Sequence, residues 1–289
     1  MPSGRMSHNA GTILQMKRTR TIPKTRNNVR GVPIGRGSAI QVVDRLTLIL
    51  ELFAANGREM RVREIADALR LQRSTTHRYL ASLANAGFLR SDDGGSYSLG
   101  PLLIQLGAAA VAGSEVVNLA ETYLHQLAEE AQETVVLSLW TGHCPVVVRV
   151  REPINKLVQI HIRLGALLPL DSAQGHVFLA CNPDQVQARR LLAQFPDSQR
   201  RELERGIEEV RRTGAWINSR VAEGIRAVAV PVFDHEIIVC TLALVGTLAS
   251  IPSSLDSGLV QALKATAQRL SQDLGGRRDA KPRAEGVWA

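Results

Sequence analysis

Residues 61–99 constrain the fold most, because their apolar spacing predicts two helices, a tight turn between them and a hairpin. In residues 61–70 the apolar positions follow the three-and-four spacing of a one-faced helix (Val62, Ile65, Ala66 and Leu69). Leu71–Arg73 then make the turn, and Ser74 or Thr75 can cap the second helix with its hydroxyl group. The segment therefore predicts a helix-turn-helix.

The second helix has one inward side, which carries Thr76, Tyr79, Leu80 and Leu83. Its outward side and N-terminal end carry only hydrogen-bond donors and cations: Gln72, Arg73, Ser74, Thr75, His77, Arg78 and Ser82. Such a face suits the major groove of DNA, and we predict that these seven residues contact it. The alternative is a helical hairpin whose polar face is merely solvated.

A hairpin is predicted directly after Gly87. Residues 88–91 and 96–99 flank Asp92-Asp93-Gly94-Gly95, which is a strong turn signal. Residues 38–56 read as the preceding helix, which ends before Gly57. We therefore expect a winged helix-turn-helix domain over residues 38–101.

Several motifs occur in a characteristic order: SAIQVVDRL at 38–46, RSTTHRYL at 73–80, YSLG at 97–100, RLG at 163–165, PL at 169–170, SAQG at 172–175 and AVAVPV at 227–232. Together they resemble the IclR family of bacterial transcriptional regulators over about residues 38 to 275. The resemblance implies a DNA-binding regulator that forms dimers. It also implies a GAF-like C-terminal domain that binds small effectors.

The excess positive charge lies in residues 1–37, which hold eight Lys or Arg residues and no acidic residue. The other 27 basic residues of the 35 balance the 27 acidic ones. We predict that this tail is disordered, either as a phosphate-binding arm or as a passive extension. Its composition alone does not exclude a mitochondrial presequence, but no secretory signal and no membrane-spanning run is predicted. The odd, sparse set of three cysteines points to a reducing cytoplasm, so we expect a cytoplasmic protein.

The rest of the chain predicts a mixed domain. An apolar linker helix at 102–114 needs a partner surface, which a homodimer or a dimer of dimers would supply. Beyond it we expect helices at 114–133, 172–181, 184–194, 197–213 and 255–274, and strands at 134–140, 146–151, 157–162, 215–218, 227–233 and 237–246. This order indicates an α+β effector domain around an antiparallel sheet at residues 115–276, followed by a disordered tail at 277–289.

The helix that starts near Ser172 offers free amide groups to an anion, although Ser172 can also simply cap it. The resemblance implies that effectors contact this helix start and that Asp234 and Cys240 line the same cavity. The predicted effector-binding residues are Ser172, Ala173, Gln174, Gly175, Asp234, Cys240, Ala243 and Val245. Relatives often have lysine at His176, serines at Ala243 and Val245, and a longer turn at 234–236, so we expect a small organic acid with an apolar body.

Catalytic motifs are missing from the C-terminal half: it has no paired carboxylates, GxSxG, P-loop or metal-ligand spacing. The cysteines Cys144, Cys181 and Cys240 are sparse and lack CxxC spacing, so we predict no cofactor and no metal. The favoured function is a sequence-specific transcriptional regulator whose binding to a double-stranded DNA operator is controlled by an effector. The alternatives are an enzyme with a regulatory N-terminal domain and a non-specific nucleic-acid binder driven by the tail.

Overall fold

The computed structural model describes residues 41–154, 156, 158 and 160–275. The predictions for the tails at 1–37 and 277–289 and for the helix start at 38–40 concern residues outside this set, as does the prediction for Leu157.

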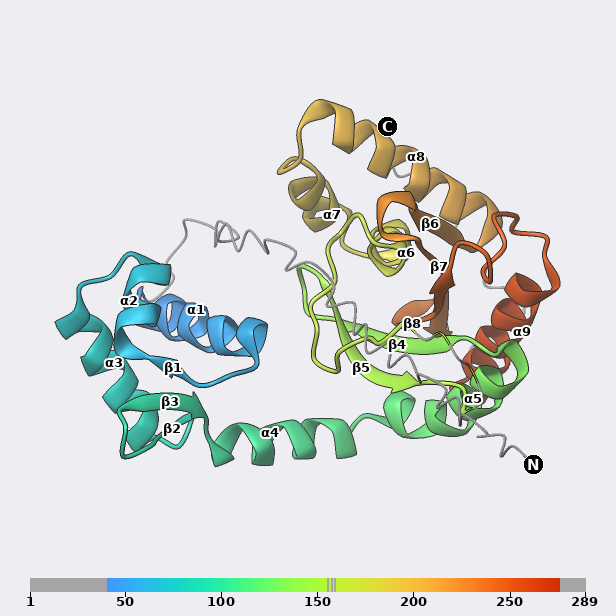
Figure 1. Cartoon of the computed structure of the whole chain (residues 1–289). Coiled ribbons are helices and arrows are strands. Elements are labelled where there is room, and N and C mark those ends of the chain that lie inside the picture. Colours follow the sequence, from blue (N-terminus) through green and yellow to red (C-terminus); the bar gives the residue numbers. More distant parts are fainter. Residues whose placement is uncertain (1–40, 155, 157, 159, 276–289) are drawn as a thin grey trace, which may run out of the picture. The chain divides into compact units, whose positions relative to one another are not determined.

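The N-terminal elements follow the predicted order of helices and wing (Figure 1). They are α1 (Gln41–Asn56), β1 (Met60–Arg61), α2 (Val62–Leu69), α3 (Arg73–Asn85), β2 (Leu89–Ser91) and β3 (Ser96–Leu99). The strands form an antiparallel sheet in the order β1-β3-β2. The helix-turn-helix and its wing are thus confirmed, and β1 is a two-residue strand that the sequence did not predict.

Packing of α2 and α3 follows their apolar spacing. Ile65 and Ala66 of α2 are buried, as are Thr76, Leu80 and Leu83 of α3. Gly87 comes just after α3 with a φ of +80°, a conformation that glycine adopts at no steric cost and that commonly ends a helix. The inward and outward faces of α3 are therefore fixed by its core contacts.

The C-terminal elements form one sheet flanked by helices (Figure 1). They are α4 (Pro101–Ala112), α5 (Glu115–Ala131), β4 (Thr134–Trp140), β5 (Pro145–Arg151), α6 (Ala173–Cys181), α7 (Gln185–Leu192), α8 (Asp197–Thr213), β6 (Trp216–Arg220), the 3₁₀ turn η1 (Val221–Glu223), β7 (Ile225–Asp234), β8 (Ile237–Thr247) and α9 (Gly258–Asp273). The strand order is β5-β4-β8-β7-β6, and every neighbouring pair is antiparallel. The predicted α+β architecture is confirmed.

Each face of this sheet packs on its own helices (Figure 1). One core joins α5 and α9 to the side chains of Leu242 and Leu244, and another joins α6, α7 and α8 to Ala229 and Ala243. A smaller cluster of Val136, Val147 and Val245 packs against residues 160–168. Side chains alternate along a strand, so one strand serves both cores.

The central strands set which residues meet on the α6 side. Across β4 and β8, Val136 pairs with Ala243 and Ser138 pairs with Thr241. Between β7 and β8 the register shifts near Val232, because β8 contributes one extra residue, Val239, before Cys240. This irregularity is a β-bulge, and the ladder is regular again from Cys240 onward.

The expected strand at 157–162 is wrong, because residues 160–162 are not in a strand. The free edge of β5 is instead bonded by residues 165–168: the amide of Gly165 donates to the carbonyl of Val147 over 2.8 Å, and the amide of Leu168 donates to the carbonyl of Pro145 over 2.8 Å. Apolar alternation at 157–162 therefore reflects packing, with Ile160 and Ile162 against the small valine cluster.

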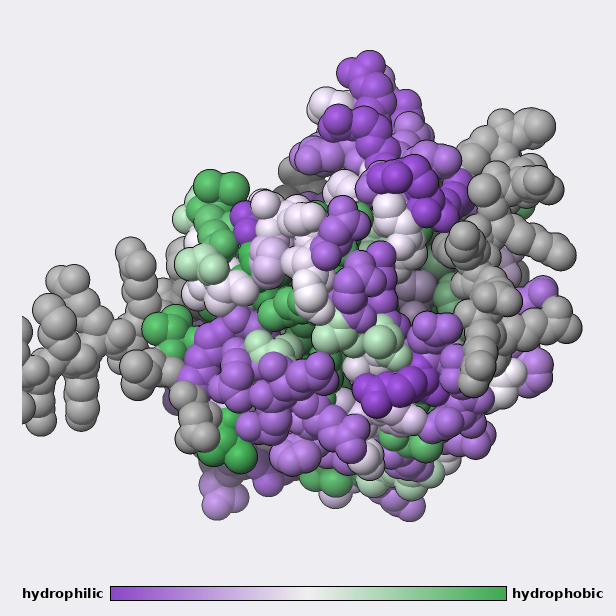
Figure 2. All heavy atoms as spheres, turned by 90° about the vertical axis from the view of Figure 1, so that its right-hand side faces the viewer, coloured by the Kyte–Doolittle hydropathy of each residue, from purple (hydrophilic) through white to green (hydrophobic). Residues whose placement is uncertain are grey.

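The side of the C-terminal half that carries α8 and α9 is mostly hydrophilic, and its hydrophobic residues lie in small separate groups (Figure 2). Among the described residues, none of the helices is by itself long and apolar enough to cross a bilayer. Helices α4 and α5 meet that criterion only as a pair that bends by 77° at its break.

Candidate functional site

Helix α3 presents the residues predicted to contact DNA. Six of them are exposed, and Thr75 is half-buried; the exposed ones are Gln72, Arg73, Ser74, His77, Arg78 and Ser82. The helix contains no acidic residue. Within the part of the chain that the structure describes, Arg73 and Arg78 form no ion pair with a carboxylate. Their guanidinium groups are therefore available for a phosphate or a base edge.

The predicted hydroxyl cap of α3 is wrong. The helix begins at Arg73, so Gln72 is the N-cap, and its side chain makes no capping hydrogen bond. The amide and the hydroxyl of Thr76 both donate to the carbonyl of Gln72, over 2.9 and 3.1 Å. Because this bond starts the helix two or three residues earlier than expected, Ser74 and Thr75 lie within its first turn rather than before it.

Ser172 caps α6, the helix predicted to bind the effector. Its hydroxyl oxygen accepts from the amide of Gly175 over 3.0 Å, and its carbonyl accepts the amide of His176 over 3.1 Å. The amides of Ala173 and Gln174 precede this first turn of bonding, so an incoming anion can accept from them. A side chain at Gly175 would meet the carbonyl oxygen of Leu170 at 2.3 Å, so only glycine allows this close approach.

A neighbouring strand holds the loop before α6. The side-chain amide of Asn218 in β6 donates to the carbonyl of Asp171 over 2.5 Å. The carboxylate of Asp171 lies 3.9 Å from the guanidinium of Arg220. The start of α6 is thus tied to the edge of the sheet, and a cation stands near it.

The sheet brings Ala243 and Val245 to the α6 side but not Cys240. Ala243 packs in the α6–α8 core and Val245 in the valine cluster, whereas Cys240 packs with Leu242 and Leu244 against α5 and α9. Cys240 precedes Ala243 by three residues in a regular ladder, so alternation puts the two on opposite faces. Cys240 therefore does not line one wall together with α6, Ala243 and Val245, contrary to the expectation.

Asp234 also lies elsewhere. It ends β7, its carboxylate is 2.7 Å from Nδ1 of His235, and it lies near Gly275 after α9. The position on β7 that does face Val245 is Ala227, which pairs with it and packs on both clusters of the α6 side. We correct the predicted wall accordingly, with Ala227 in place of Asp234 and Cys240.

His176 occupies the position at which the resemblance implies a lysine in many relatives, and it is buried. Its Nδ1 donates to the carbonyl of Ser172 over 2.8 Å, and its ring stacks on Trp216 with 4.9 Å between ring centroids. Desolvation lowers the pKa of His176, against weaker opposing contributions from Ser172 and Asp171. At neutral pH the ring is uncharged, so it does not replace a lysine cation.

The surroundings of the three cysteines disfavour the thiolate form. Burial raises the pKa of Cys181 to about 12, and it raises the pKa of Cys240 further still. Burial also raises the pKa of Cys144, which contacts Thr141. A thiol that stays protonated is a poor nucleophile and a poor metal ligand. Nor do three His, Cys, Asp or Glu side chains come together in the described residues as a metal site requires.

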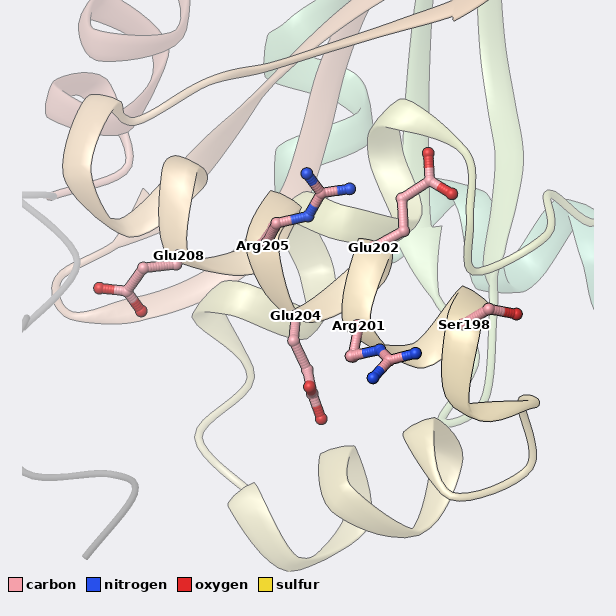
Figure 3. Close-up of a pocket in the computed structure, with 6 residues that line it drawn as sticks. All are labelled: Ser198, Arg201, Glu202, Glu204, Arg205 and Glu208. Atoms are coloured by element: carbon pink, nitrogen blue, oxygen red, sulfur yellow. The ribbon is translucent and has the colours of Figure 1, made fainter.

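A hollow of about 610 Å³ lies over the surface of α8 (Figure 3). It is lined by Ser198, Arg201, Glu202, Glu204, Arg205 and Glu208. These residues are exposed, and they leave one helix in different directions with mixed charges (Figure 3). Such a surface is solvated and does not enclose a ligand, so the α6 side of the sheet remains the candidate effector site.

Both halves of the chain match known protein families. The IclR helix-turn-helix domain matches residues 42–93, and the C-terminal domain of bacterial transcriptional regulator IclR matches residues 108–272. The chain belongs to the IclR family. It is similar to the transcriptional regulator XynR of Escherichia coli strain K12, with 29% identity over 223 residues that cover 73% of this chain and 87% of that regulator.

Solved IclR structures share this fold. The crystal structure of an IclR transcriptional regulator from Alicyclobacillus acidocaldarius is 30% identical, with a TM-score of 0.67, and the match covers 81% of this chain and 98% of that one. A regulator from Silicibacter sp. TM1040 is 23% identical with a TM-score of 0.71, over 82% and 97% of the two chains. The protein is therefore a DNA-binding transcriptional regulator with an IclR helix-turn-helix domain and a C-terminal effector domain, and not an enzyme.

For this member of the IclR family, sequence reasoning missed part of the α6 side. Ser138 on β4 and Thr241 on β8 are fully buried beside α6, and neither was proposed as a site residue. The sequence did hold a signal for these two site residues, because each is a hydroxyl-bearing residue within an otherwise apolar strand. The strand pairing that brings them together was not predicted.

Proposed function

We propose that the protein binds a specific operator in double-stranded DNA through α3 and that a small carboxylic acid bound beside α6 controls this binding. The observation that carries the DNA-reading part is the exposed row of donors and cations on a helix without acidic residues. Helices of this kind place their N-terminal residues against base edges in the major groove. The proposal assigns base or phosphate contacts to Gln72, Arg73, Ser74, Thr75, His77, Arg78 and Ser82.

Support for an acid effector comes from the start of α6. Ala173 and Gln174 are buried there, and their amides can donate to an anion while Ala227, Ala243 and Val245 offer an apolar wall. An IclR homolog from Microbacterium hydrocarbonoxydans, 20% identical to this chain, was crystallised as a complex with 4-hydroxybenzoate. That ligand is an acid of the proposed class.

We also propose that the protein is a cytoplasmic homodimer, or a dimer of dimers, and that it binds a palindromic operator. Helix α4 has no buried residue in the described chain, and Ile104 is 73% exposed. An apolar helix surface of this kind is stabilised when a second copy covers it. Two α3 helices related by a two-fold axis would then contact half-sites separated by whole turns of DNA.

The test of DNA reading removes one side chain. Arg78→Ala is expected to weaken operator binding by about 1 to 3 kcal/mol and to relax the preference at one base pair, if Arg78 contacts a guanine. The measurement is a gel shift with operator variants from the DNA upstream of the gene. Arg63→Ala, on the exposed face of α2, is the matched control for lost charge. Unchanged affinity and base preference in Arg78→Ala would refute the assignment of α3.

A further inference from the structure

Three buried polar side chains lie on the α6 side of the sheet: Ser138 of β4, Gln174 of α6 and Thr241 of β8. Ser138 and Thr241 are 0% exposed, and Gln174 is 3% exposed. The hydroxyl of Ser138 donates to Oε1 of Gln174 over 3.0 Å, and Nε2 of Gln174 donates to the carbonyl of Val136 over 3.4 Å. The polar residue in the first turn of α6 therefore reaches the centre of the sheet.

Thr241 is the exception in this group, because its hydroxyl has no hydrogen-bond partner among the described residues. Thr241 pairs directly with Ser138, so the two side chains are neighbours on one face. It shares that face with Ala243 and Val245, which follow at two-residue intervals. A buried hydroxyl without a partner is costly, so its presence here calls for a group that it can bond.

The unused donors and acceptors of Ser138 and Thr241 define the chemical group that can bond to them. Ser138 uses its proton on Gln174, which leaves lone pairs on its oxygen. Thr241 retains both its proton and its lone pairs. A single hydroxyl group would satisfy both side chains, because it can accept from Thr241 and donate to Ser138.

We infer that the effector is a hydroxylated carboxylic acid whose hydroxyl group is bound by Thr241 and Ser138. The inference rests on the proposed function, which puts the carboxylate at the amides of Ala173 and Gln174. Gln174 links the two polar ends, since its amide belongs to the helix start and its side chain bonds Ser138. Ala243 and Val245 contact the apolar body of the ligand.

The experiment is isothermal titration of the full chain with matched acids: benzoate against 3- and 4-hydroxybenzoate, and butyrate against 4-hydroxybutyrate. We expect at least one hydroxy acid to bind about tenfold more tightly than its parent acid, as one added hydrogen bond to a buried group would give. Thr241→Val should abolish that preference and leave the affinity for the parent acid unchanged. Thr241→Ser, which keeps the hydroxyl, should retain the preference.

Ser271→Ala is the matched control, since it removes a buried hydroxyl from α9 that already bonds the amide of Phe233 and the carbonyl of Ala267. It should leave the preference intact. Equal binding of the parent and hydroxy acids by the unaltered protein, or a preference that survives Thr241→Val, would overturn the inference and leave the acid effector standing. If no acid of either kind binds, the proposed acid effector is wrong as well.

Discussion

The burial of His176 makes the stability of the effector domain depend on pH. Its pKa is lowered in the folded state from the ordinary value of 6.5, chiefly by desolvation. As pH falls below that value, the unfolded chain takes up a proton that the folded chain does not bind, so the free energy of unfolding decreases. We expect a slope of up to about 1.4 kcal/mol per pH unit from this residue, measured by urea unfolding between pH 7 and 5.

His176→Gln should lose this acid-dependent slope, although it will also lose the stack on Trp216 and start from a lower stability. His125→Gln removes an exposed imidazole from α5 and serves as the control. A slope that persists in His176→Gln and disappears in His125→Gln would show that another group carries the pH dependence.

Single residues also show where sequence reasoning succeeds. Thr76, Leu80 and Leu83 were placed inside and Arg78 outside from helical periodicity alone, and the structure agrees. The resemblance to the family put Cys240 in the predicted effector site, although strand alternation puts Cys240 and Ala243 on opposite faces of the sheet. Periodicity is a physical constraint on each chain, whereas a shared motif does not fix which face a neighbouring residue takes.

Helix α4 is the element that most needs a partner. Ile104 is 73% and Leu106 is 50% exposed, and fully burying an isoleucine side chain stabilises an assembly by about 1.5 to 3 kcal/mol. We expect Ile104→Glu to convert dimers to monomers at micromolar concentration in analytical ultracentrifugation. Gln105→Glu adds the same charge at an exposed polar position of α4 and should not. An unaltered oligomer in Ile104→Glu would exclude α4 from the interface.

Long elements were predictable and short ones were not. Helices such as α8 and α9 have several turns of apolar spacing and a recognisable end or cap, including Gly214 after α8 and Ser257 before α9. Strand β1 has only two residues and exists because β3 offers a pairing edge. The false strand at 157–162 arose because alternation cannot show which segment reaches the edge of β5 first. Which segment pairs with the edge of a strand depends on the tertiary structure and not on the pattern of that segment alone.

At the scale of the whole molecule, regulation requires coupling between two sites. An effector shifts the protein between DNA-binding states only by the difference in its affinity for them. We expect Ala173→Trp to fill the start of α6, abolish acid binding in calorimetry and leave operator affinity within about twofold of the unaltered protein. A cooperative melting transition checks that the variant folds. Normal acid binding in Ala173→Trp would put the effector site elsewhere.

The bulge at Val239 bears on how this domain tolerates insertions and deletions. Because one surplus residue is absorbed between the turn and Cys240, a gain or loss of one residue near the turn changes the bulge and not the ladder beyond it. Thr241, Ala243 and Val245 would keep their face while the turn at 234–236 changes length. The hairpin tip can therefore vary among related chains without inverting the surface beneath α6.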